Sequence, residues 1–353
     1  MRAAVWHGAR DIRVEEVPEP GPPAPGHAVV EVARVGICGS DVSEYRDGPH
    51  AIPTERDHPV TGRRAPIILG HEYVGRVVAV GDDVANVRPG DRVCGDASLR
   101  CGSCYWCLRG EYNICQYGAA VGLHTDGAFA RYLDVPANTL EKVPDGIEDD
   151  VAAVVEPLAV GLHAVNMGGI RPGDSVVVVG FGMIGAAAML MAFAAGAGQV
   201  HVVEMNPHRR ELALKMGATE TFDPRMPRLR WEVVARTEGI GADRVLDCTG
   251  RPEMLSTSVE LTRRGGRLVV CGLGHEPAQF NTDRLVYFER GVVGALGYRF
   301  DHQRVLKILA TRDLPVRLLL GDVIGLEQIV PDGFERLLND PKAPHRILID
   351  PLT

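Results

Sequence analysis

The chain has 353 residues, which is enough for two domains that each bury their own core. Hydrophobic residues make up 45% and charged residues 24%, an ordinary globular composition. The net charge of −8 argues against nucleic acid or an anionic membrane as a partner, because both favour a basic protein surface. The first residues include Arg2, Arg10 and Asp11 and lack the apolar core of a signal peptide, so we expect a cytoplasmic protein.

The first 150 residues predict a mostly antiparallel β domain. Short segments rich in β-branched residues alternate with turns that contain glycine and proline, as in residues 27–37, 73–81 and 129–136. Several short strands separated by such turn signals are typical of antiparallel sheets.

From about Ser175 the pattern changes to strands that alternate with helices. This alternation predicts a parallel sheet with helices on both faces. The expected strands are 175–180, 199–204, 243–250 and 267–273, and the expected helices are 183–197, 207–218 and 253–266. We also expect a helix over 301–312 and a strand over 345–350.

Residues 175–203 carry no Asp, Glu, Lys or Arg, a run long enough to resemble a membrane span of about 20 residues. Three glycines divide this run into a strand, a turn and a short buried helix, so we expect no span.

The glycines of this run form the motif G-x-G-x-x-G, made of Gly180, Gly182, Met183, Ile184 and Gly185 with Phe181 between the first two glycines. The motif follows a strand and opens a helix, where backbone N–H groups can approach a pyrophosphate.

Glu204 ends the next predicted strand, 19 residues after Gly185. A carboxylate there accepts hydrogen bonds from the ribose hydroxyls of NAD and repels the 2′-phosphate of NADP. Arg209 and Arg210 follow closely and blur this choice, although we expect them to be arginines of the helix surface. The pattern predicts an NAD-binding domain.

Four cysteines lie within fifteen residues, with the spacing C-x2-C-x2-C-x7-C: Cys101, Cys104, Cys107 and Cys115. Four thiolates make a closed tetrahedral site, as in structural zinc sites. An iron–sulfur cluster is the competing interpretation, but its usual run has a last gap of three residues followed by proline. Here the gap is seven and Gln116 follows, which favours zinc.

Four further residues fit a catalytic zinc site when they are considered together. They are Cys38 in a glycine-flanked turn, the adjacent pair His71 and Glu72, and Glu156. Catalytic zinc takes three protein ligands of mixed S, N and O type and keeps one position open for water or substrate. Zinc at such a site acts as a Lewis acid on an alcohol, which can then transfer hydride to a nicotinamide.

These motifs together resemble the zinc-containing medium-chain alcohol and polyol dehydrogenases over essentially the whole chain. Within that family the chain is most similar to sorbitol and 2,3-butanediol dehydrogenases. The residues that carry the resemblance are Gly36–Asp41, Gly70–Glu72 with Gly75, Val80 and Gly81, Pro89–Val93, Val155–Leu158, the segment from Ser43 to Thr61, Gly297–Arg299, the four cysteines and the glycine motif.

The resemblance implies two zinc ions per chain, one catalytic and one structural. It implies Cys38 and His71 as catalytic ligands, with a carboxylate from Glu72 or Glu156, a choice that remains open at this stage. It also implies that the hydroxyl of Ser40 contacts the substrate oxygen. Many relatives carry a relay histidine where this chain has Ser43, which predicts a shortened or rerouted proton path.

The resemblance further implies a GroES-like, mostly antiparallel β catalytic domain and a doubly wound Rossmann domain. We assign residues 1–155 and 296–353 to the first and 156–295 to the second, with the active site in the cleft between them. Thr249, Gly272 and Leu273 are expected to line the nicotinamide side. Relatives form dimers or tetramers, so we expect a homodimer or homotetramer in which the apolar segment 287–297 serves as a sheet edge.

The expected activity is NAD-dependent oxidation of a secondary alcohol of a polyol or vicinal diol, with a small-molecule substrate. The alternatives within the fold are a cyclitol, sugar or threonine-type amino-alcohol dehydrogenase. The alternative from another class is a non-catalytic regulator that binds zinc and nucleotide, which would be favoured if Cys38 or His71 were missing.

Overall fold

A computed structural model describes residues 1–274 and 276–353. The chain divides into two compact units. Unit 1 comprises Met1–Glu156, His302–Arg312 and Leu319–Thr353, and unit 2 comprises Pro157–Asp301 and Asp313–Leu318.

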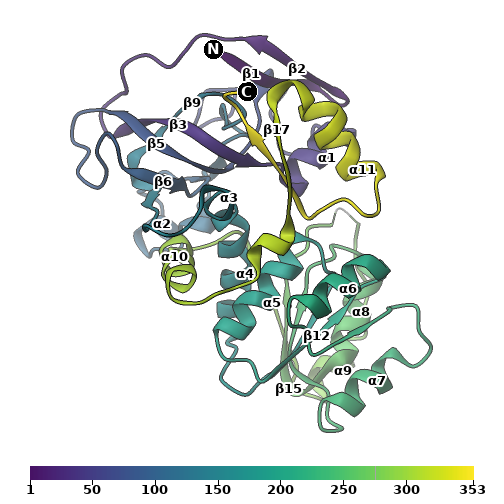
Figure 1. The fold of residues 1–353 in the computed structure, drawn as a ribbon. Helices are drawn as coiled ribbons and strands as arrows, with labels where there is room; N and C mark the ends of the chain where they lie inside the picture. The colour runs from purple at the N-terminus through teal and green to yellow at the C-terminus, as the bar shows by residue number, and fades with distance from the viewer. Residues whose placement is uncertain (275) are drawn as a thin grey trace. The chain divides into compact units, whose positions relative to one another are not determined.

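Unit 1 is built on antiparallel sheets, which confirms the predicted β domain (Figure 1). Its largest sheet has the strand order β10-β6-β5-β3-β18-β17, with β9 paired to β3, and only β17 and β18 run parallel. A three-stranded sheet has the order β2-β1-β4, and β7 pairs with β8. The strands are β1 (Arg2–Gly8), β2 (Asp11–Glu16), β3 (His27–Gly36), β4 (Ile67–Ile68), β5 (Glu72–Val80), β6 (Arg92–Gly95), β7 (Ser98–Leu99), β8 (Ala119–Ala120), β9 (Tyr132–Pro136), β10 (Leu140–Lys142), β17 (Leu320–Gly325) and β18 (Arg346–Asp350).

The α-helices of unit 1 are short. They are α1 (Gly39–Asp47), α2 (Tyr105–Leu108), α3 (Asp149–Ala152), α10 (Asp301–Thr311) and α11 (Glu335–Asn339). The core of the unit lies between the sheets, where Trp6, Tyr73 and Phe129 are almost completely buried. Strands β3 and β5 pair along most of their length, from Ala28 opposite Val80 to Gly36 opposite Glu72.

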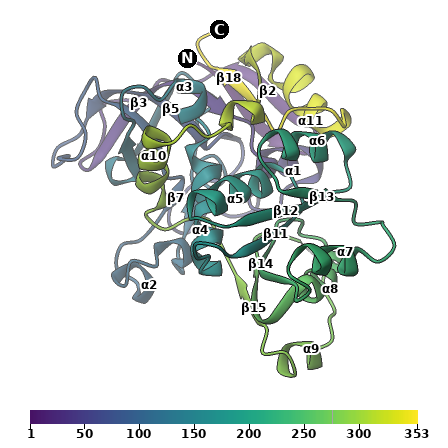
Figure 2. The same cartoon turned by 60° about the horizontal axis from the view of Figure 1, so that its bottom comes forward.

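Unit 2 is a single parallel sheet with the order β13-β12-β11-β14-β15-β16, covered by helices on both faces (Figure 2). This is the predicted doubly wound arrangement. Its strands are β11 (Ser175–Val179), β12 (Gln199–Val203), β13 (Glu220–Phe222), β14 (Ala242–Asp247), β15 (Thr262–Val270) and β16 (Gly291–Gly294). Its helices are α4 (Val155–Gly168), which begins two residues before the unit, α5 (Met183–Ala194), α6 (Pro207–Lys215), α7 (Leu229–Arg236), α8 (Pro252–Leu261) and α9 (Asp283–Val286).

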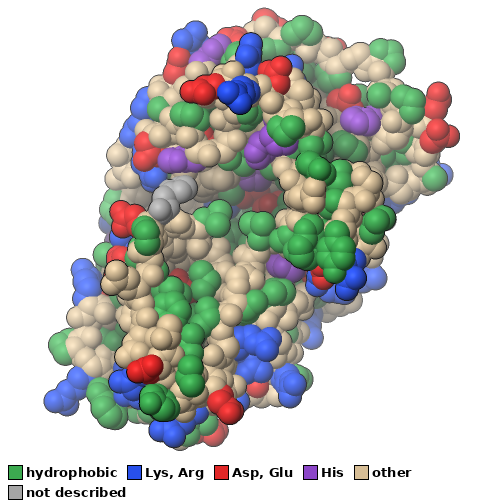
Figure 3. Space-filling model, turned by 180° about the vertical axis from the view of Figure 1, so that it is seen from behind, with side chains coloured by type: hydrophobic (Ala, Val, Ile, Leu, Met, Phe, Trp, Pro, Cys, Tyr) green, Lys and Arg blue, Asp and Glu red, His purple; other side chains and the backbone are tan. Residues whose placement is uncertain are grey.

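The sheet of unit 2 explains the apolar run of residues 175–203. All five residues of β11 are buried because helices cover both faces of the strand. Helix α5 is apolar nearly all round, and nine of its twelve residues are buried. Among the described residues no helix is both long enough and apolar enough to cross a membrane. On the face shown in Figure 3, acidic and basic side chains are interspersed.

The three helices predicted over 183–197, 207–218 and 253–266 all end earlier than expected, and the last one differs most. The helix predicted over 253–266 stops at Leu261, and strand β15 already begins at Thr262. Arg263 pairs with Asp243 on the neighbouring strand β14 at 2.6 Å, and Gly265 has a φ of +68° that no helix contains. Pairing with β14 therefore overrides the helical pattern of this segment.

Candidate active site

Cys38 lies between the end of β3 and the start of α1. The carboxylate of Asp41 accepts a hydrogen bond from the backbone N–H of Cys38 at 2.9 Å, so Asp41 fixes the first turn of the helix. Asp41 is fully buried, and burial raises the pKa of its carboxyl to about 6.

His71 lies directly before β5, and its two ring nitrogens face different partners. Nε2 lies 3.4 Å from the hydroxyl of Ser40, whereas Nδ1 lies 3.5 Å from Oδ1 of Asp41. Burial lowers the pKa of His71, but the charges of Asp41 and Cys38 outweigh burial and raise it well above its usual value. A carboxylate behind Nδ1 is the arrangement that orients a histidine toward a metal with Nε2.

Glu72 is held by an arginine that the sequence did not single out. Arg346, on β18, donates to both carboxylate oxygens of Glu72 at 2.6 and 2.7 Å, and both side chains are buried. The same guanidinium lies 3.7 Å from the sulfur of Cys38. Burial lowers the pKa of Arg346, but the charges of Glu72 and Cys38 more than offset this and raise it. Arg346 therefore links two residues of the predicted metal site.

The cluster fits a metal ion. One ligand atom each from Cys38, His71 and Glu72 lie within 4.8 Å of one another. Burial and the charge of Glu72 both raise the pKa of the Cys38 thiol, so the thiolate is disfavoured until a cation is present. A sulfur, an imidazole nitrogen and carboxylate oxygens are the donors of catalytic zinc sites.

Glu156 is not a member of this compact cluster. It opens α4, and its charge contributes to the raised pKa values of both His71 and Arg346. Glu156 therefore lies within electrostatic reach of the cluster.

The four cysteines 101, 104, 107 and 115 also converge. Sulfur–sulfur distances are 3.9 Å for Cys101–Cys107, 3.8 Å for Cys104–Cys115 and 3.6 Å for Cys101–Cys115. Tetrahedral zinc with bonds of about 2.3 Å places its sulfurs about 3.8 Å apart, so the lobe has the dimensions of a closed zinc site.

Charge supports the same interpretation of the lobe. Backbone N–H groups of Ser103 and Cys104 lower the pKa of Cys101 to about 6, while burial and neighbouring thiols raise that of Cys107 to about 12. The protein alone thus stabilises some of the thiolates, and a cation is needed for all four.

The glycine motif forms the turn between β11 and α5. Gly180 has a φ of +86°, and a Cβ on Gly185 would lie 1.9 Å from the carbonyl oxygen of Gly180, so the helix can approach the turn only without a side chain there. Gly182 caps α5, and a Cβ there would meet nothing within 4 Å, which leaves space for a ligand beside the helix N-terminus.

Glu204 reaches this turn from the end of β12. Its carboxylate accepts hydrogen bonds from the backbone N–H of Phe181 at 2.7 Å and of Asn206 at 2.8 Å. Arg210 donates hydrogen bonds to the backbone carbonyls of Glu204 and Met205, so its guanidinium is already engaged by the protein. The buried Nε of Arg209 has no hydrogen-bond partner within residues 1–274 and 276–353.

Thr249, Gly272 and Leu273 lie in the loops that follow β14 and β15. Asp247 holds the first loop in place, because its carboxylate accepts hydrogen bonds from both the backbone N–H and the hydroxyl of Thr249. The two loops touch: a Cβ on Gly272 would lie 2.1 Å from the backbone nitrogen of Gly250. Leu273 is exposed.

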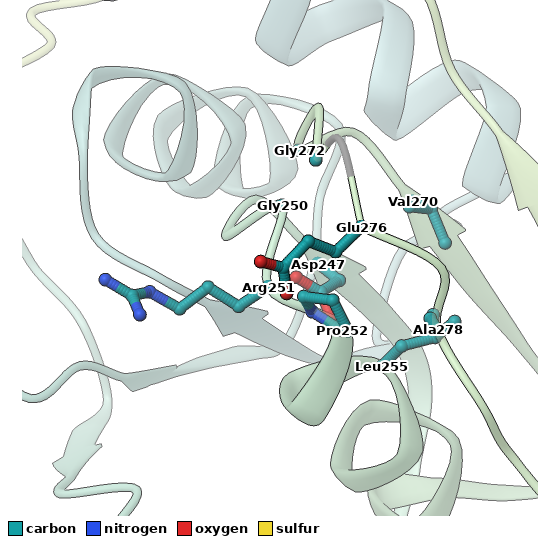
Figure 4. Close-up of a pocket in the computed structure, with 10 residues that line it drawn as sticks. Asp247, Gly250, Arg251, Pro252, Leu255, Val270, Gly272, Glu276 and Ala278 are labelled. Atoms are coloured by element: carbon teal, nitrogen blue, oxygen red, sulfur yellow. The ribbon is translucent and has the colours of Figure 1, made fainter.

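A pocket opens at these loops. Figure 4 shows that Glu276, Asp247 and Gly250 lie close together in it, whereas the guanidinium of Arg251 points away. The full lining is Asp247, Gly250, Arg251, Pro252, Leu255, Val270, Gly272, Gly274, Glu276 and Ala278. It therefore includes Gly272, whereas Thr249 and Leu273 are outside it.

One unit thus carries a buried cluster with the donors of catalytic zinc, and the other carries a dinucleotide-binding turn. These are the two components that metal-assisted oxidation of an alcohol with a nicotinamide requires.

Comparison with known proteins agrees with this combination. Residues 24–145 match the family of alcohol dehydrogenase GroES-like domains, and residues 184–311 match the family of zinc-binding dehydrogenases. The chain is 34% identical to the (R,R)-butanediol dehydrogenase of Bacillus subtilis, over 99% of this chain and 100% of that protein. It is 32% identical to the sorbitol dehydrogenase of the same organism, over 99% of this chain and 97% of that protein.

Among solved structures, the crystal structure of 2R,3R-butanediol dehydrogenase from Bacillus subtilis superimposes with a TM-score of 0.93, at 34% identity and 99% coverage of both chains. The chain belongs to the zinc-binding dehydrogenase family. It is an enzyme, an oxidoreductase that uses zinc and a nucleotide cofactor, which confirms the predicted family and reaction class and sets aside the non-catalytic regulator.

Proposed function

We propose that the enzyme oxidises a secondary alcohol of a vicinal diol or polyol and transfers the hydride to NAD. The observation that carries this proposal is the buried cluster of Cys38, His71 and Glu72 with the hydroxyl of Ser40 beside Nε2 of His71. The similarity to butanediol and sorbitol dehydrogenases supports the substrate class.

Cys38 and His71 are proposed to hold the catalytic zinc, with Glu156 as the third ligand. The negative charge of Glu72 is neutralised by Arg346. The thiolate of Cys38 therefore balances only one of the two positive charges of a divalent ion. The carboxylate of Glu156 would balance the other charge. Zinc bound there supplies Lewis acidity toward the substrate hydroxyl. Glu72 then acts beside the metal, positioned by Arg346.

Ser40 is proposed to relay the proton of the substrate hydroxyl, because its Oγ can accept that proton as it gives up its own. Its position at the start of α1, half-buried and 3.4 Å from Nε2 of His71, supports this role. Ser43 lies one helical turn further along α1. Ser43 stands where many relatives carry a relay histidine, and a serine hydroxyl cannot hold a released proton near neutral pH. We therefore propose that the proton passed on by Ser40 leaves through water or the cofactor ribose rather than stopping at Ser43.

NAD is proposed as the cofactor because the carboxylate of Glu204 lies beside the glycine turn. A 2′-phosphate would bring two negative charges against this buried carboxylate. The ring side of the cofactor is proposed to contact the loops of Thr249, Gly272 and Leu273. Preference for NADP would point to the unpaired Nε of Arg209 as the phosphate contact.

A cofactor-reduction screen tests the proposal. Vicinal diols, hexitols, inositols and threonine are offered with NAD and with NADP, and kcat/KM is compared. We expect the highest values for a vicinal diol or hexitol with NAD. Activity confined to inositol, a sugar or threonine would select one of the alternative substrate classes, and equal or better use of NADP would overturn the assignment of Glu204.

We further propose that residues 1–155 and 296–353 act as the catalytic domain and 156–295 as the cofactor domain, in a cytoplasmic homodimer or homotetramer. Strand β16 supports the assembly, because it is the outer strand of its sheet and lies between the exposed side chains of Tyr287 and Leu296. Pairing of β16 with the same strand of a second chain would bury both sheet edges. Sedimentation equilibrium of the purified enzyme measures the assembly.

A further inference from the structure

Two histidines outside the metal cluster are in ring contact in unit 1, in a tilted arrangement. The rings of His58 and His124 lie with their centroids 4.6 Å apart at an angle of 58°. His58 belongs to the long segment between α1 and β4, and His124 belongs to the turn after β8. Both side chains are partly buried.

The backbone fixes which ring nitrogen carries the proton. Nδ1 of His58 accepts from the backbone N–H of Val60 at 3.3 Å, and Nδ1 of His124 accepts from that of Ala120 at 3.0 Å. An imidazole that accepts at Nδ1 carries its hydrogen on Nε2 when it is neutral. Neither Nε2 has a hydrogen-bond partner in the described part of the chain, so the pair presents two N–H donors.

The environment keeps both rings neutral. Burial lowers the pKa of His58, and burial together with the neighbouring His58 lowers that of His124, although the charge of Glu44 opposes this. Neutral donors suit hydroxyl groups, whereas an anion would be favoured by a charged imidazolium.

The pair is tied to the elements that carry the metal cluster. A Cβ on Gly122 or on Gly127 would lie 2.6 or 2.3 Å from the carbonyl oxygen of Gly70, so the turn of His124 packs directly on the residue before His71. Glu44, which acts electrostatically on His124, lies one helical turn after Ser40 on α1.

The segment that carries His58 is fastened to the same turn. The hydroxyl of Thr61 donates to the carbonyl oxygen of His124, and Arg63 forms an ion pair with Asp126. Asp126 also accepts from the backbone N–H of Ile68 at 3.2 Å, in the strand that leads to His71. The segments that carry the two histidines are therefore attached to the residues that lead to His71.

We propose that His58 and His124 form a hydroxyl-recognition site that binds the non-reacting hydroxyl groups of a neutral diol or polyol and so determines substrate specificity. The inference rests on the proposed function. A polar group that loses its hydrogen-bond partner weakens binding, whereas an alcohol without a second hydroxyl gains nothing from these donors.

The test distinguishes Nε2, the proposed donor, from Nδ1, which accepts a hydrogen bond from the backbone. His124→Asn keeps an acceptor near the position of Nδ1 and loses the donor at Nε2, whereas His124→Gln keeps a donor near Nε2. The measured quantity is the ratio of kcat/KM for 2,3-butanediol or sorbitol to that for 2-butanol. We expect His124→Asn and His58→Asn to lower this ratio by about 5- to 20-fold, with partial recovery in His124→Gln.

His27→Ala, which removes an exposed histidine paired with Asp134 in the same unit, is the matched control and should leave the ratio unchanged. An equal loss on diol and 2-butanol would show a structural role and overturn the inference. So would a preference of the wild-type enzyme for a hydroxy acid or a phosphorylated polyol.

A binding measurement distinguishes this inference from the proposed function. In protein labelled with 13C-histidine, the ring signals of His58 and His124, assigned with the Asn variants, should shift when sorbitol or 2,3-butanediol is added. Unmoved signals overturn the histidine site even if the enzyme oxidises diols. Shifted signals in an enzyme that oxidises no alcohol support the site and refute the proposed reaction.

Discussion

The two candidate metal sites of unit 1 are built in opposite ways. The four-cysteine lobe takes all its ligands from residues 101–115, and its cysteines are half-buried. The catalytic cluster joins residues as far apart in the chain as Cys38 and Arg346, which are separated by 308 residues, and its charged groups are buried. A local site of four like ligands gains its stability from the metal, whereas the dispersed site is shaped by the fold before any metal binds.

The largest expected effects are a loss of activity when the catalytic cluster is changed and a loss of stability when the four-cysteine lobe is changed. Cys38→Ala should lower kcat/KM roughly 10³-fold or more, because the Lewis acid loses a ligand, and leave the thermal midpoint nearly unchanged. Cys104→Ala should lower Tm by roughly 10 °C, since loss of a closed site costs several kcal/mol. Metal analysis should give two zinc ions per chain in the wild type, one for each cluster. It should give about one zinc ion per chain in Cys38→Ala.

Unfolding scans and zinc determinations on both variants check these effects. If Cys38→Ala unfolded as easily as Cys104→Ala, the catalytic cluster would also be a folding site, and the contrast between the two sites would fail.

The next effect concerns the proton path beside the catalytic cluster. Ser40→Ala should lower kcat/KM about 10²-fold, the usual scale for a positioned proton-transfer group. Ser43→Ala, one turn away on α1, serves as the matched variant and should change kcat/KM far less. Steady-state kinetics on the preferred alcohol decide the matter, and comparable damage from both serines would make Ser43 a working member of the relay.

Arg346 tests whether the fold shapes the dispersed site. Arg346→Met should weaken zinc binding at the catalytic cluster by about 10- to 100-fold, because Glu72 loses the partner that positions it. Competition with a chelator measures this affinity. Arg34→Met is the matched control, since Arg34 pairs with Asp150 and Asp350 in the same unit without touching a metal residue.

The control should keep both zinc ions. Unchanged zinc affinity in Arg346→Met would mean that the Glu72–Arg346 pair contributes only to packing.

The smallest expected effect lies in the four-cysteine lobe. The hydroxyl of Ser103 lies 3.7 Å from the sulfur of Cys101, an exposed contact that adds little to the metal bonds. Ser103→Ala should therefore lower Tm by less than about 4 °C and leave the zinc content unchanged. A loss of zinc in this variant would show that the lobe depends on its surroundings as the catalytic cluster does.

The features that could be predicted from the sequence are those whose chemistry is local. The glycine motif and the four cysteines act within a few residues of each other, so their spacing alone carries the geometry. The alternation of strands and helices gave the sheet of unit 2 for the same reason, because each element shows its own periodicity.

The features that could not be predicted depend on contacts between distant segments. Arg346 has no motif, and it reaches Glu72 only because β18 inserts next to β3. The early end of α8 follows from pairing of Arg263 with Asp243 across the sheet. The ring contact of His58 and His124 likewise joins two loops 66 residues apart.

The position of Arg346 in the chain also sets an order of events during biosynthesis. The four cysteines have all been synthesised once residue 115 is complete, whereas Arg346 follows roughly 230 residues later, after the whole parallel sheet. At ribosomal rates of about 5–20 residues per second, this interval lasts about 10 to 50 s. The nascent enzyme can therefore take up its structural metal on the ribosome well before the arginine that positions Glu72 exists, so the catalytic site is completed last.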